Sequence, residues 1–308
     1  MTIKHLVISG GGLLGLRYLG ALEKLEKEGI WKLENIESIY GTSIGSTIGA
    51  FICLNYDWET LNKYIIDRPW KDAFKLTARQ ILDSYHNKGL FDKKLCEIIF
   101  KPLLEAKDLN INITLKQFYE FSKIDLHIFT FEINNFETIE LSHTTHPDLS
   151  LLQALTMSSS FPGIFMPTII DNKCYIDGGV MYNYPLNQCL KEHTIRDEIL
   201  GIKYLRDGVN GTFKNVEITE ESSLLEYVIC LTINSMKFIR DTVKIEDIDN
   251  TVICYITENP LTLDFIQEVI KNKDLRREWI EMGEKDAILF IDKYRNNEND
   301  YNDLLDNV

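Results

Sequence analysis

The sequence is short of positive charge. Its 308 residues include 33 Lys and Arg against 47 Asp and Glu, which gives a formal net charge of −14 at pH 7. A chain this acidic is repelled by phosphate backbones, so we do not expect nucleic acid as a partner, and contact with an anionic bilayer would need a local patch of opposite sign. The six cysteines are scattered without a C-x-x-C pair. That pattern indicates reduced thiols rather than a disulfide framework or a zinc site.

Long apolar runs are also missing. The N-terminus has no hydrophobic leader core, and Thr2 stands where myristoylation requires glycine. Residues 38–56 carry no charge, but Gly, Ser and Thr are frequent among them, which favours a buried strand, turn and helix over a membrane span. We therefore expect an intracellular, cytoplasmic protein that could associate peripherally with membranes.

The first part of the chain is organised as two strands that each run through a glycine-rich turn into a helix. An apolar strand is predicted at 5–9 and ends in the run Gly10–Gly15, which opens an amphipathic helix. A second strand near 38–40 ends in Gly41–Gly45 and leads into a helix of small and apolar residues near 46–54. Two successive units of this kind favour a parallel α/β sheet with right-handed crossovers.

The rest of the chain predicts one α/β domain over residues 1–295. Residues 57–125 are expected to be mostly helical, and so is the C-terminal part, 206–295. The acidic tail 296–308 is rich in Asn and Asp and is expected to fray. No internal repeat or low-complexity linker divides the chain. Further strands are predicted at 127–133, 137–142, 173–176, 198–205 and 251–256, and further helices at 151–157, 222–240, 264–271 and 276–294.

The first glycine-rich turn has the spacing G-x-G-x-x-G at Gly10, Gly12 and Gly15. Backbone N–H groups in such a loop, at the positive end of a helix, suit a dinucleotide pyrophosphate or an oxyanion, and the loop could also serve only tight packing. A nucleotide site needs an acidic residue at the end of the second strand to bind the ribose. Here the second strand delivers a serine instead, which disfavours the nucleotide interpretation.

That serine, Ser43, lies in the G-x-S-x-G pattern Gly41-Thr-Ser43-Ile44-Gly45, between a strand and a helix. A nucleophile elbow needs small neighbours so that the backbone can turn sharply and present the Ser43 hydroxyl. The alternative is that Ser43 only caps the helix.

A serine nucleophile needs a base, and the histidines offer no good candidate. His143 and His146 fall in an expected loop beside Pro147, without an evident third metal ligand. The remaining candidate is Asp177, which ends a short predicted strand and is followed by Gly178 and Gly179. An Asp-Gly pair is most often an ordinary turn.

Taken in order, these three motifs resemble the patatin-like phospholipases, lipid acyl hydrolases with a Ser–Asp dyad. The resemblance covers residues 5–205 approximately. It is supported by the apolar stretch Ala154–Pro167 and by Asn183-Tyr-Pro185. One departure stands out: the family usually has Arg or Lys before the last glycine of the loop, where this chain has Leu14, with Arg17 one helical turn further on.

The resemblance implies a three-layer α/β/α fold with a mainly parallel central sheet. It implies that Ser43 is the nucleophile, Asp177 the proton acceptor, and the N–H groups around Gly11 and Gly12 the oxyanion hole. The expected reaction is hydrolysis of fatty acyl esters of phospholipids or related lipids through an acyl-enzyme on Ser43, without metal or cofactor. Headgroup, acyl position and chain length are not specified, and the effect of Leu14 on rate is open.

Two other classes of protein remain as alternatives: a lipid-binding or scaffold protein of the same fold without turnover, and a nucleotide-dependent oxidoreductase that uses the Gly10–Gly15 loop. Residues 63–79 bear on membrane access. They hold five basic residues against two acidic ones, with Tyr64, Trp70 and Phe74 interleaved. The segment is either an interfacial face that presents the site to lipid or a solvated helix that packs its aromatic side chains into the core.

Overall fold

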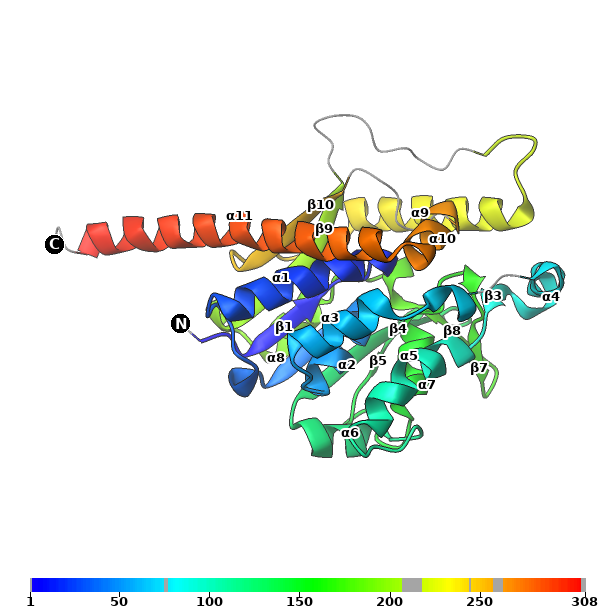
Figure 1. The fold of residues 1–308 in the computed structure, drawn as a ribbon, viewed down its shortest axis with the longest axis horizontal. Coiled ribbons are helices and arrows are strands. Elements are labelled where there is room, and N and C mark those ends of the chain that lie inside the picture. The colour runs from blue at the N-terminus through cyan, green and yellow to red at the C-terminus, as the bar shows by residue number, and fades with distance from the viewer. Residues whose placement is uncertain (1, 75–76, 207–217, 244, 257–262, 306–308) are drawn as a thin grey trace.

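A large β-sheet forms the centre of the molecule (Figure 1). The computed structural model describes residues 2–74, 77–206, 218–243, 245–256 and 263–305. Within them the sheet has eight strands in the order β10-β9-β1-β2-β4-β8-β7, and β5 pairs with β4 beside this path. The strands are β1 (His5–Ile8), β2 (Ser38–Thr42), β4 (Asp125–Glu132), β5 (Glu137–Leu141), β7 (Thr168–Ile170), β8 (Lys173–Asp177), β9 (Ile199–Arg206) and β10 (Thr251–Ile256).

The five strands from β10 to β4 are parallel to their neighbours, whereas β5, β8 and β7 run antiparallel at the other side of the sheet. The central parallel strands β1 and β2 are buried on both faces, as helical crossovers require. A separate two-stranded parallel sheet joins β3 (Gly89–Phe91) to β6 (Gly163–Phe165). The expected mainly parallel α/β fold is therefore confirmed.

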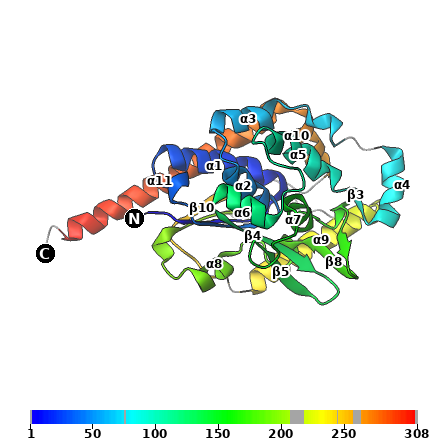
Figure 2. The same ribbon diagram turned by 90° about the horizontal axis from the view of Figure 1, so that it is seen from below.

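Helices cover both faces of the sheet. They are α1 (Gly15–Lys27), α2 (Ile44–Cys53), α3 (Trp58–Asp67), α4 (Ala78–Asn87), α5 (Lys94–Glu105), α6 (Leu115–Ser122), α7 (Leu151–Ser158), α8 (Leu186–Glu192), α9 (Leu224–Thr242), α10 (Leu263–Lys271) and α11 (Lys273–Leu305). Figure 2 shows α8 on the opposite side of the sheet from α1 and α2.

Side chains of the central strands alternate between two cores, as the two-residue period of a strand requires. Leu6, Ile8 and Ile39 pack in the larger core with α1, α2 and α11. Val7 and Tyr40 point the other way, into a smaller core that includes residues of α8. The three layers follow from this alternation.

The C-terminal helix α11 lies along α1 (Figure 1). Glycines allow the two helix backbones to approach closely. A Cβ on Gly20 would collide with the carbonyl group of Ile280, and a Cβ on Gly283 would collide with the carbonyl group of Arg17. The Arg17 guanidinium is buried in this contact, donates to both carboxylate oxygens of Asp286 and also donates to the carbonyl oxygen of Tyr255 at 2.6 Å. α11 thereby ties the C-terminal part of the chain to the first helix.

The strand register brings three distant segments to one level of the sheet. Ile8 pairs with Gly41, and Thr42 pairs with Phe129 of β4. Because β8 runs antiparallel to β4, its last residue, Asp177, pairs with Thr130. The residues that follow β1 and β2 and the residue that ends β8 therefore meet at the same edge of the sheet.

Most predicted elements lie within a few residues of the observed ones, and the differences are local. The mostly helical segment 57–125 also contains β3, and the apolar stretch before Pro167 contributes β6. α11 extends to Leu305, into the tail that was expected to fray, because no Gly or Pro stops it there. Residues 306–308 of that tail, and residues 207–217, 244 and 257–262 of the C-terminal part, lie outside the described residues.

The buried ion pair gives a stability prediction. Asp286→Leu leaves the Arg17 charge buried without its carboxylate, so we expect the free energy of unfolding to fall by about 3–5 kcal/mol. The double variant Arg17→Met with Asp286→Leu removes both charges and should recover most of that loss. Urea unfolding at pH 7 measures both. A double variant as unstable as the single one would contradict this account.

Candidate active site

Ser43 sits in a strained turn between β2 and α2. Its backbone angles are φ 55° and ψ −123°, a conformation that side-chain-bearing residues rarely adopt. The turn is tight because a Cβ on Gly41 would lie 2.6 Å from the backbone of Gly45, and a Cβ on Gly45 would collide with the carbonyl oxygen of Ile8. The two glycines of the sequence pattern are thus required by close backbone approach, and the geometry is that of a nucleophile elbow.

The Ser43 hydroxyl donates a hydrogen bond of 2.6 Å to Oδ2 of Asp177. The other carboxylate oxygen of Asp177 accepts the N–H of Gly179 at 2.7 Å. Both side chains are buried, with residue exposures of 8% for Ser43 and 4% for Asp177. Burial outweighs these hydrogen bonds and raises the pKa of Asp177 to about 6. A carboxylate of that pKa is a better proton acceptor at neutral pH than an ordinary one.

Gly178 and Gly179 shape the turn after Asp177. A Cβ on Gly178 would collide with the carbonyl oxygen of Phe129, and one on Gly179 would lie 2.6 Å from Oδ1 of Asn183. The Asp-Gly-Gly motif therefore lets the chain leave β8 against the backbone of β4 while keeping the Asp177 carboxylate beside Ser43.

The first glycine-rich turn supplies free backbone donors next to Ser43. Gly12 has φ 57°, in the left-handed region that favours glycine. Within the part of the chain that the structure describes, the N–H groups of Gly11, Gly12 and Ile44 have no protein acceptor. All three residues line the same cavity as Ser43. Free N–H groups beside a serine hydroxyl are candidate donors for an oxyanion hole.

The outer glycines of this turn have structural contacts instead. The N–H of Gly10 donates to the carbonyl oxygen of Asn183 at 2.9 Å, and the Asn183 side chain donates back to Gly10. Gly15 begins α1, and its N–H donates to the carbonyl oxygens of Gly12 and Leu13. It also packs so closely on the Ile44 side chain that a Cβ at position 15 would collide with it. The sequence pattern does not distinguish these two glycines from the two with free N–H groups.

Ser158 supports the elbow and was not singled out by sequence reasoning. Its Oγ accepts the N–H of Ser43 at 2.8 Å and donates to the carbonyl oxygen of Phe129 at 2.6 Å. Ser46 contacts the same Oγ at 3.0 Å and donates to the carbonyl oxygen of Gly41. The run of three serines before Phe161 is the sequence signal, but only contact shows that Ser158 is the one that holds Ser43.

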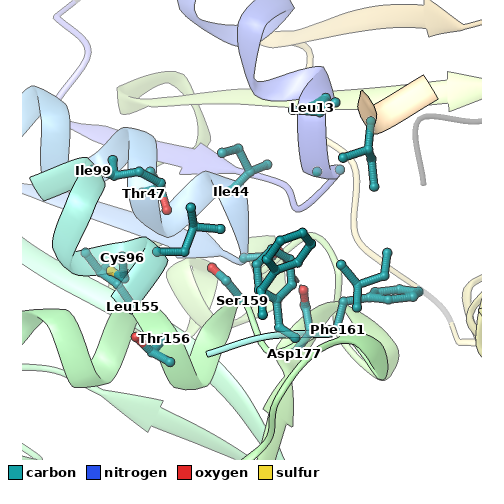
Figure 3. A pocket seen from close by; sticks show the side chains of 18 of the residues that line it. Leu13, Ile44, Thr47, Cys96, Ile99, Leu155, Thr156, Ser159, Phe161 and Asp177 are labelled. Carbon is teal, nitrogen blue, oxygen red and sulfur yellow. Dashed lines mark hydrogen bonds between the residues drawn. The ribbon is translucent and has the colours of Figure 1, made fainter. Parts of the chain in front are cut away.

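Ser43 and Asp177 line a cavity of about 230 Å³ (Figure 3). Its walls are almost entirely apolar and come from α2, α5, α7, α9 and the β3–β6 sheet, including Phe91, Leu155, Ile164 and Met236. A cavity of this size exceeds the ~150 Å³ that encloses a benzene ring in an engineered protein interior. It suits a hydrocarbon chain and offers little to a charged ligand.

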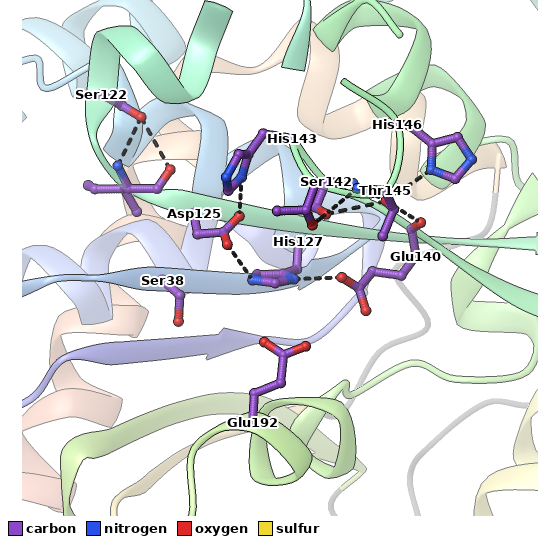
Figure 4. A network of polar contacts seen from close by, with 12 residues as sticks. Ser38, Ser122, Asp125, His127, Glu140, Ser142, His143, Thr145, His146 and Glu192 are labelled. Atoms are coloured by element: carbon purple, nitrogen blue, oxygen red, sulfur yellow. Dashed lines mark hydrogen bonds and ion pairs between the residues drawn. The ribbon is translucent and has the colours of Figure 1, made fainter. Parts of the chain in front are cut away.

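No histidine is found among the described residues that line this cavity. Instead, His127 lies in a polar network on the other face of the sheet (Figure 4). Burial opposes its charge, but hydrogen bonds to Asp125 and Glu140 outweigh burial and raise the pKa of His127 to about 9. His143 donates a hydrogen bond of 2.8 Å to Oδ1 of Asp125, so His127 and His143 have carboxylate partners away from Ser43.

A possible metal cluster also lies in this network. Ligand atoms of His127, Glu140 and Glu192 are within 4.8 Å of one another. Each already has a protein partner, since His127 contacts Glu140 at 2.7 Å and Glu192 accepts the Tyr40 hydroxyl. His146, the second histidine of the expected loop, contacts Thr145 and does not converge with His143 on a common point.

The basic residue near the first glycine-rich turn does not reach the candidate oxyanion hole, and the aromatic side chains of segment 63–79 do not form an outer face for lipid contact. Leu14 is fully buried, and Arg17 is bound to Asp286, so no basic side chain from this turn reaches the Gly11–Gly12 donors. In the segment 63–79 the aromatic side chains face inward: Trp70 donates to the carbonyl oxygen of Ile65, and Phe74 lines the cavity. Residues 75–76 of that segment lie outside the described residues.

Across the residues that the structure describes, no helix combines the length and the apolar character needed to cross a bilayer.

Known proteins resemble this chain in sequence and in fold. A family model described as patatin-like phospholipase matches residues 6–190. A probable lipid hydrolase, 463L of Invertebrate iridescent virus 6, is 30% identical over 198 residues, which are 63% of this chain and 66% of that protein. The lysophospholipase NTE1 of Kluyveromyces lactis is 24% identical over 183 residues, 59% of this chain but 11% of that much longer protein.

Among solved structures, VipD from Legionella pneumophila superposes with a TM-score of 0.54 at 16% identity, over 95% of this chain and 67% of that one. This likeness concerns the fold. The motifs, the sheet and the family match over residues 6–190 together define the class of protein. The chain belongs to the patatin-like phospholipase family.

The raised pKa of Asp177 gives a prediction about pH. If Asp177 is the proton acceptor for Ser43, it must be ionised to act, and the rate with a soluble ester should fall about tenfold for each pH unit below about 6. Initial rates between pH 4.5 and 8 measure the acid limb of the free protein. A limb near pH 4, the ordinary value for an aspartate, would contradict the raised pKa.

Proposed function

We propose that this protein hydrolyses fatty acyl esters of phospholipids or related lipids, with Ser43 as nucleophile and Asp177 as proton acceptor. The observation that carries the proposal is the 2.6 Å hydrogen bond between the two side chains, made at a strained elbow that faces an apolar cavity. The names of two relatives, a probable lipid hydrolase and a lysophospholipase, support the same substrate class.

The reaction proceeds in two halves. Asp177 takes the hydroxyl proton as Ser43 Oγ attacks the ester carbonyl, and the N–H groups of Gly11, Gly12 and Ile44 stabilise the oxyanion. When the tetrahedral intermediate collapses, Asp177 returns the proton to the departing alcohol oxygen, and the acyl group stays on Ser43. Water then attacks the acyl-enzyme with Asp177 again taking a proton. Release of the fatty acid restores the Ser43 hydroxyl.

The same features oppose the two alternatives. A nucleotide-dependent oxidoreductase needs polar groups for ribose and pyrophosphate, whereas the exposed wall of the cavity beside the Gly10–Gly15 turn is mostly apolar and the second strand ends without an acidic residue. A lipid-binding protein without turnover has no use for a strained Ser43 or for a buried Asp177 of raised pKa.

Substitution of either residue tests the mechanism. Ser43→Ala and Asp177→Asn should each lower hydrolysis of a soluble ester by about 10⁴-fold or more, because either change removes the same proton transfer. A fluorophosphonate should form a stoichiometric adduct on Ser43, detected by mass mapping, and should form none in Asp177→Asn.

The matched control is Ser38→Ala, which removes a buried serine from the same strand on the other face of the sheet. It should keep the wild-type rate of labelling within about threefold. A fully folded wild-type protein that takes no label, with detergent or liposomes present, would contradict hydrolysis and favour lipid binding without turnover.

We assign contact with a lipid surface to α9 rather than to the aromatic residues of segment 63–79. Leu224, Tyr227, Leu231 and Phe238 follow one another at helical spacing on one face of α9 and are between 51% and 72% exposed. The opposite face of α9 lines the cavity through Met236. One helix thus joins the cavity wall to an apolar outer stripe.

The charge of this region fits a lipid surface. α9 carries two acidic and two basic side chains within a chain of net charge −14. The nearby helix α4 packs on β3, which pairs with the β6 strand contacted by α9, and α4 exposes Ile81, Leu82 and Tyr85. A neutral, apolar surface beside the cavity avoids the repulsion that the rest of the chain would feel from an anionic bilayer.

Charged substitutions on the stripe test this contact. Leu231→Glu with Phe238→Glu should weaken binding to phosphatidylcholine liposomes by about tenfold or more, since burying a Leu or Phe side chain contributes roughly 1.5–3 kcal/mol. Hydrolysis of a soluble ester should be unchanged. Ile195→Glu, at a side chain that is 58% exposed outside α4 and α9, is the control. Equal loss of binding in both proteins would argue for a general charge effect.

A further inference from the structure

A second cavity, of about 130 Å³, adjoins the one that contains Ser43. It lies among α1, α2, α3 and α10, and the mechanism proposed above does not use it. The cavities have six lining residues in common: Gly12, Leu13, Ile44, Thr47, Phe74 and Ile99. Figure 3 shows Leu13, Ile44, Thr47 and Ile99 together on one side of the first cavity.

The common wall includes the groups that would bind the reacting carbonyl. Gly12 and Ile44 supply free N–H groups of the candidate oxyanion hole, and Ile44 directly follows Ser43. Because this wall belongs to both cavities, an ester held at these donors is next to each of them. A lipid with a single chain can fill one of them, and a lipid with two chains can reach both.

The second cavity accepts only an apolar group. Leu19, Ile48 and Val269 form its interior with exposures of 3% or less. Away from the wall shared with the first cavity, its large polar side chains are already satisfied: the Arg276 guanidinium donates to the carbonyl oxygens of Ile66, Val269 and Ile270, and Trp70 donates to the carbonyl oxygen of Ile65. An apolar interior of this kind stays dry and binds hydrocarbon.

We propose that this second cavity binds the acyl chain that is not cleaved, so that the preferred substrate is a diacyl lipid rather than a lysolipid. The inference rests on the proposed function, because it takes the first cavity as the site of the cleaved chain. The chain in the second cavity contributes binding energy away from the reacting bond, which positions the ester against Ser43.

Substitutions that fill the second cavity test, by rates of lipid hydrolysis, whether it binds the uncleaved acyl chain. Val269→Phe on α10 and Leu19→Phe on α1 add bulk from two different walls, and neither residue lines the first cavity. Each should lower kcat/KM for dipalmitoyl phosphatidylcholine in mixed micelles by about tenfold or more. Hydrolysis of 1-palmitoyl lysophosphatidylcholine and of a short soluble ester should stay within about twofold of wild type.

The matched control fills the first cavity instead. Leu155→Phe makes the same substitution as Leu19→Phe at a residue of equal burial that lines only the first cavity. It should lower hydrolysis of both long-chain lipids together. Diacyl hydrolysis unchanged in Val269→Phe and Leu19→Phe, or a loss in them that is equal for all three substrates, would overturn the proposal.

A binding measurement separates this inference from hydrolysis itself. Trp70 lines the second cavity and not the first. In a Ser43→Ala background, phosphatidylcholine with bromine atoms on one chain should quench the Trp70 contribution, defined by comparison with Ser43→Ala/Trp70→Phe. One of the two positional isomers should quench strongly, and Val269→Phe should abolish the effect.

The two possible failures differ in outcome. Wild-type protein that cleaves none of the esters, while brominated lipid still quenches Trp70, would contradict the proposed function and support the second cavity as a chain site. Hydrolysis without any quenching by either isomer would support the function and overturn the second-chain site.

Discussion

The buried hydrogen bond between Ser43 and Asp177 is the interaction on which the site depends. Burying a carboxylate is unfavourable unless hydrogen bonds compensate, and Asp177 receives two, from the Ser43 hydroxyl and from the Gly179 N–H. Burial still prevails and raises the pKa of Asp177 to about 6. The same desolvation that disfavours the charge thus makes the carboxylate a stronger base, which a two-residue site without histidine requires.

The scaffold around this bond consists of close backbone contacts that leave little room for other residues. Gly45 lies against Ile8, Gly178 against Phe129, and Ser158 bridges the Ser43 N–H to the carbonyl oxygen of the same Phe129. Backbone strain at Ser43 persists because these surrounding contacts fix the turn. The central position of Phe129 in β4 explains how one buried strand can hold both Ser43 and Asp177 in place.

Charge and apolar surface are separated in this fold. His127, with its carboxylate partners Asp125 and Glu140, stacks on Tyr40 on the α8 side of the sheet, and the Arg17 charge is bound between α1 and α11. The Ser43 side is left with two adjoining apolar cavities and an apolar stripe on α9. This separation leaves a strongly acidic chain with an apolar region beside Ser43 that suits a lipid.

The sequence alone determined the two β-turn-α units, the elbow around Ser43 and the Asp177-Gly178-Gly179 motif, because glycine spacing and short apolar runs are local signals. It also indicated the mainly parallel sheet. It did not determine which of the serines before Phe161 supports the elbow, or that α11 continues to Leu305. Those depend on contacts between segments far apart in the chain.

Only the tertiary structure decided which groups meet. Ser43 and Asp177 are 134 residues apart, and they approach because β8 runs antiparallel to β4 and ends level with the turn after β2. Contacts between distant segments also set three other features. Trp70 points inward, Arg17 binds Asp286, and two cavities meet beside Ile44. Strand register and helix packing set these positions, and no local pattern of residues encodes them.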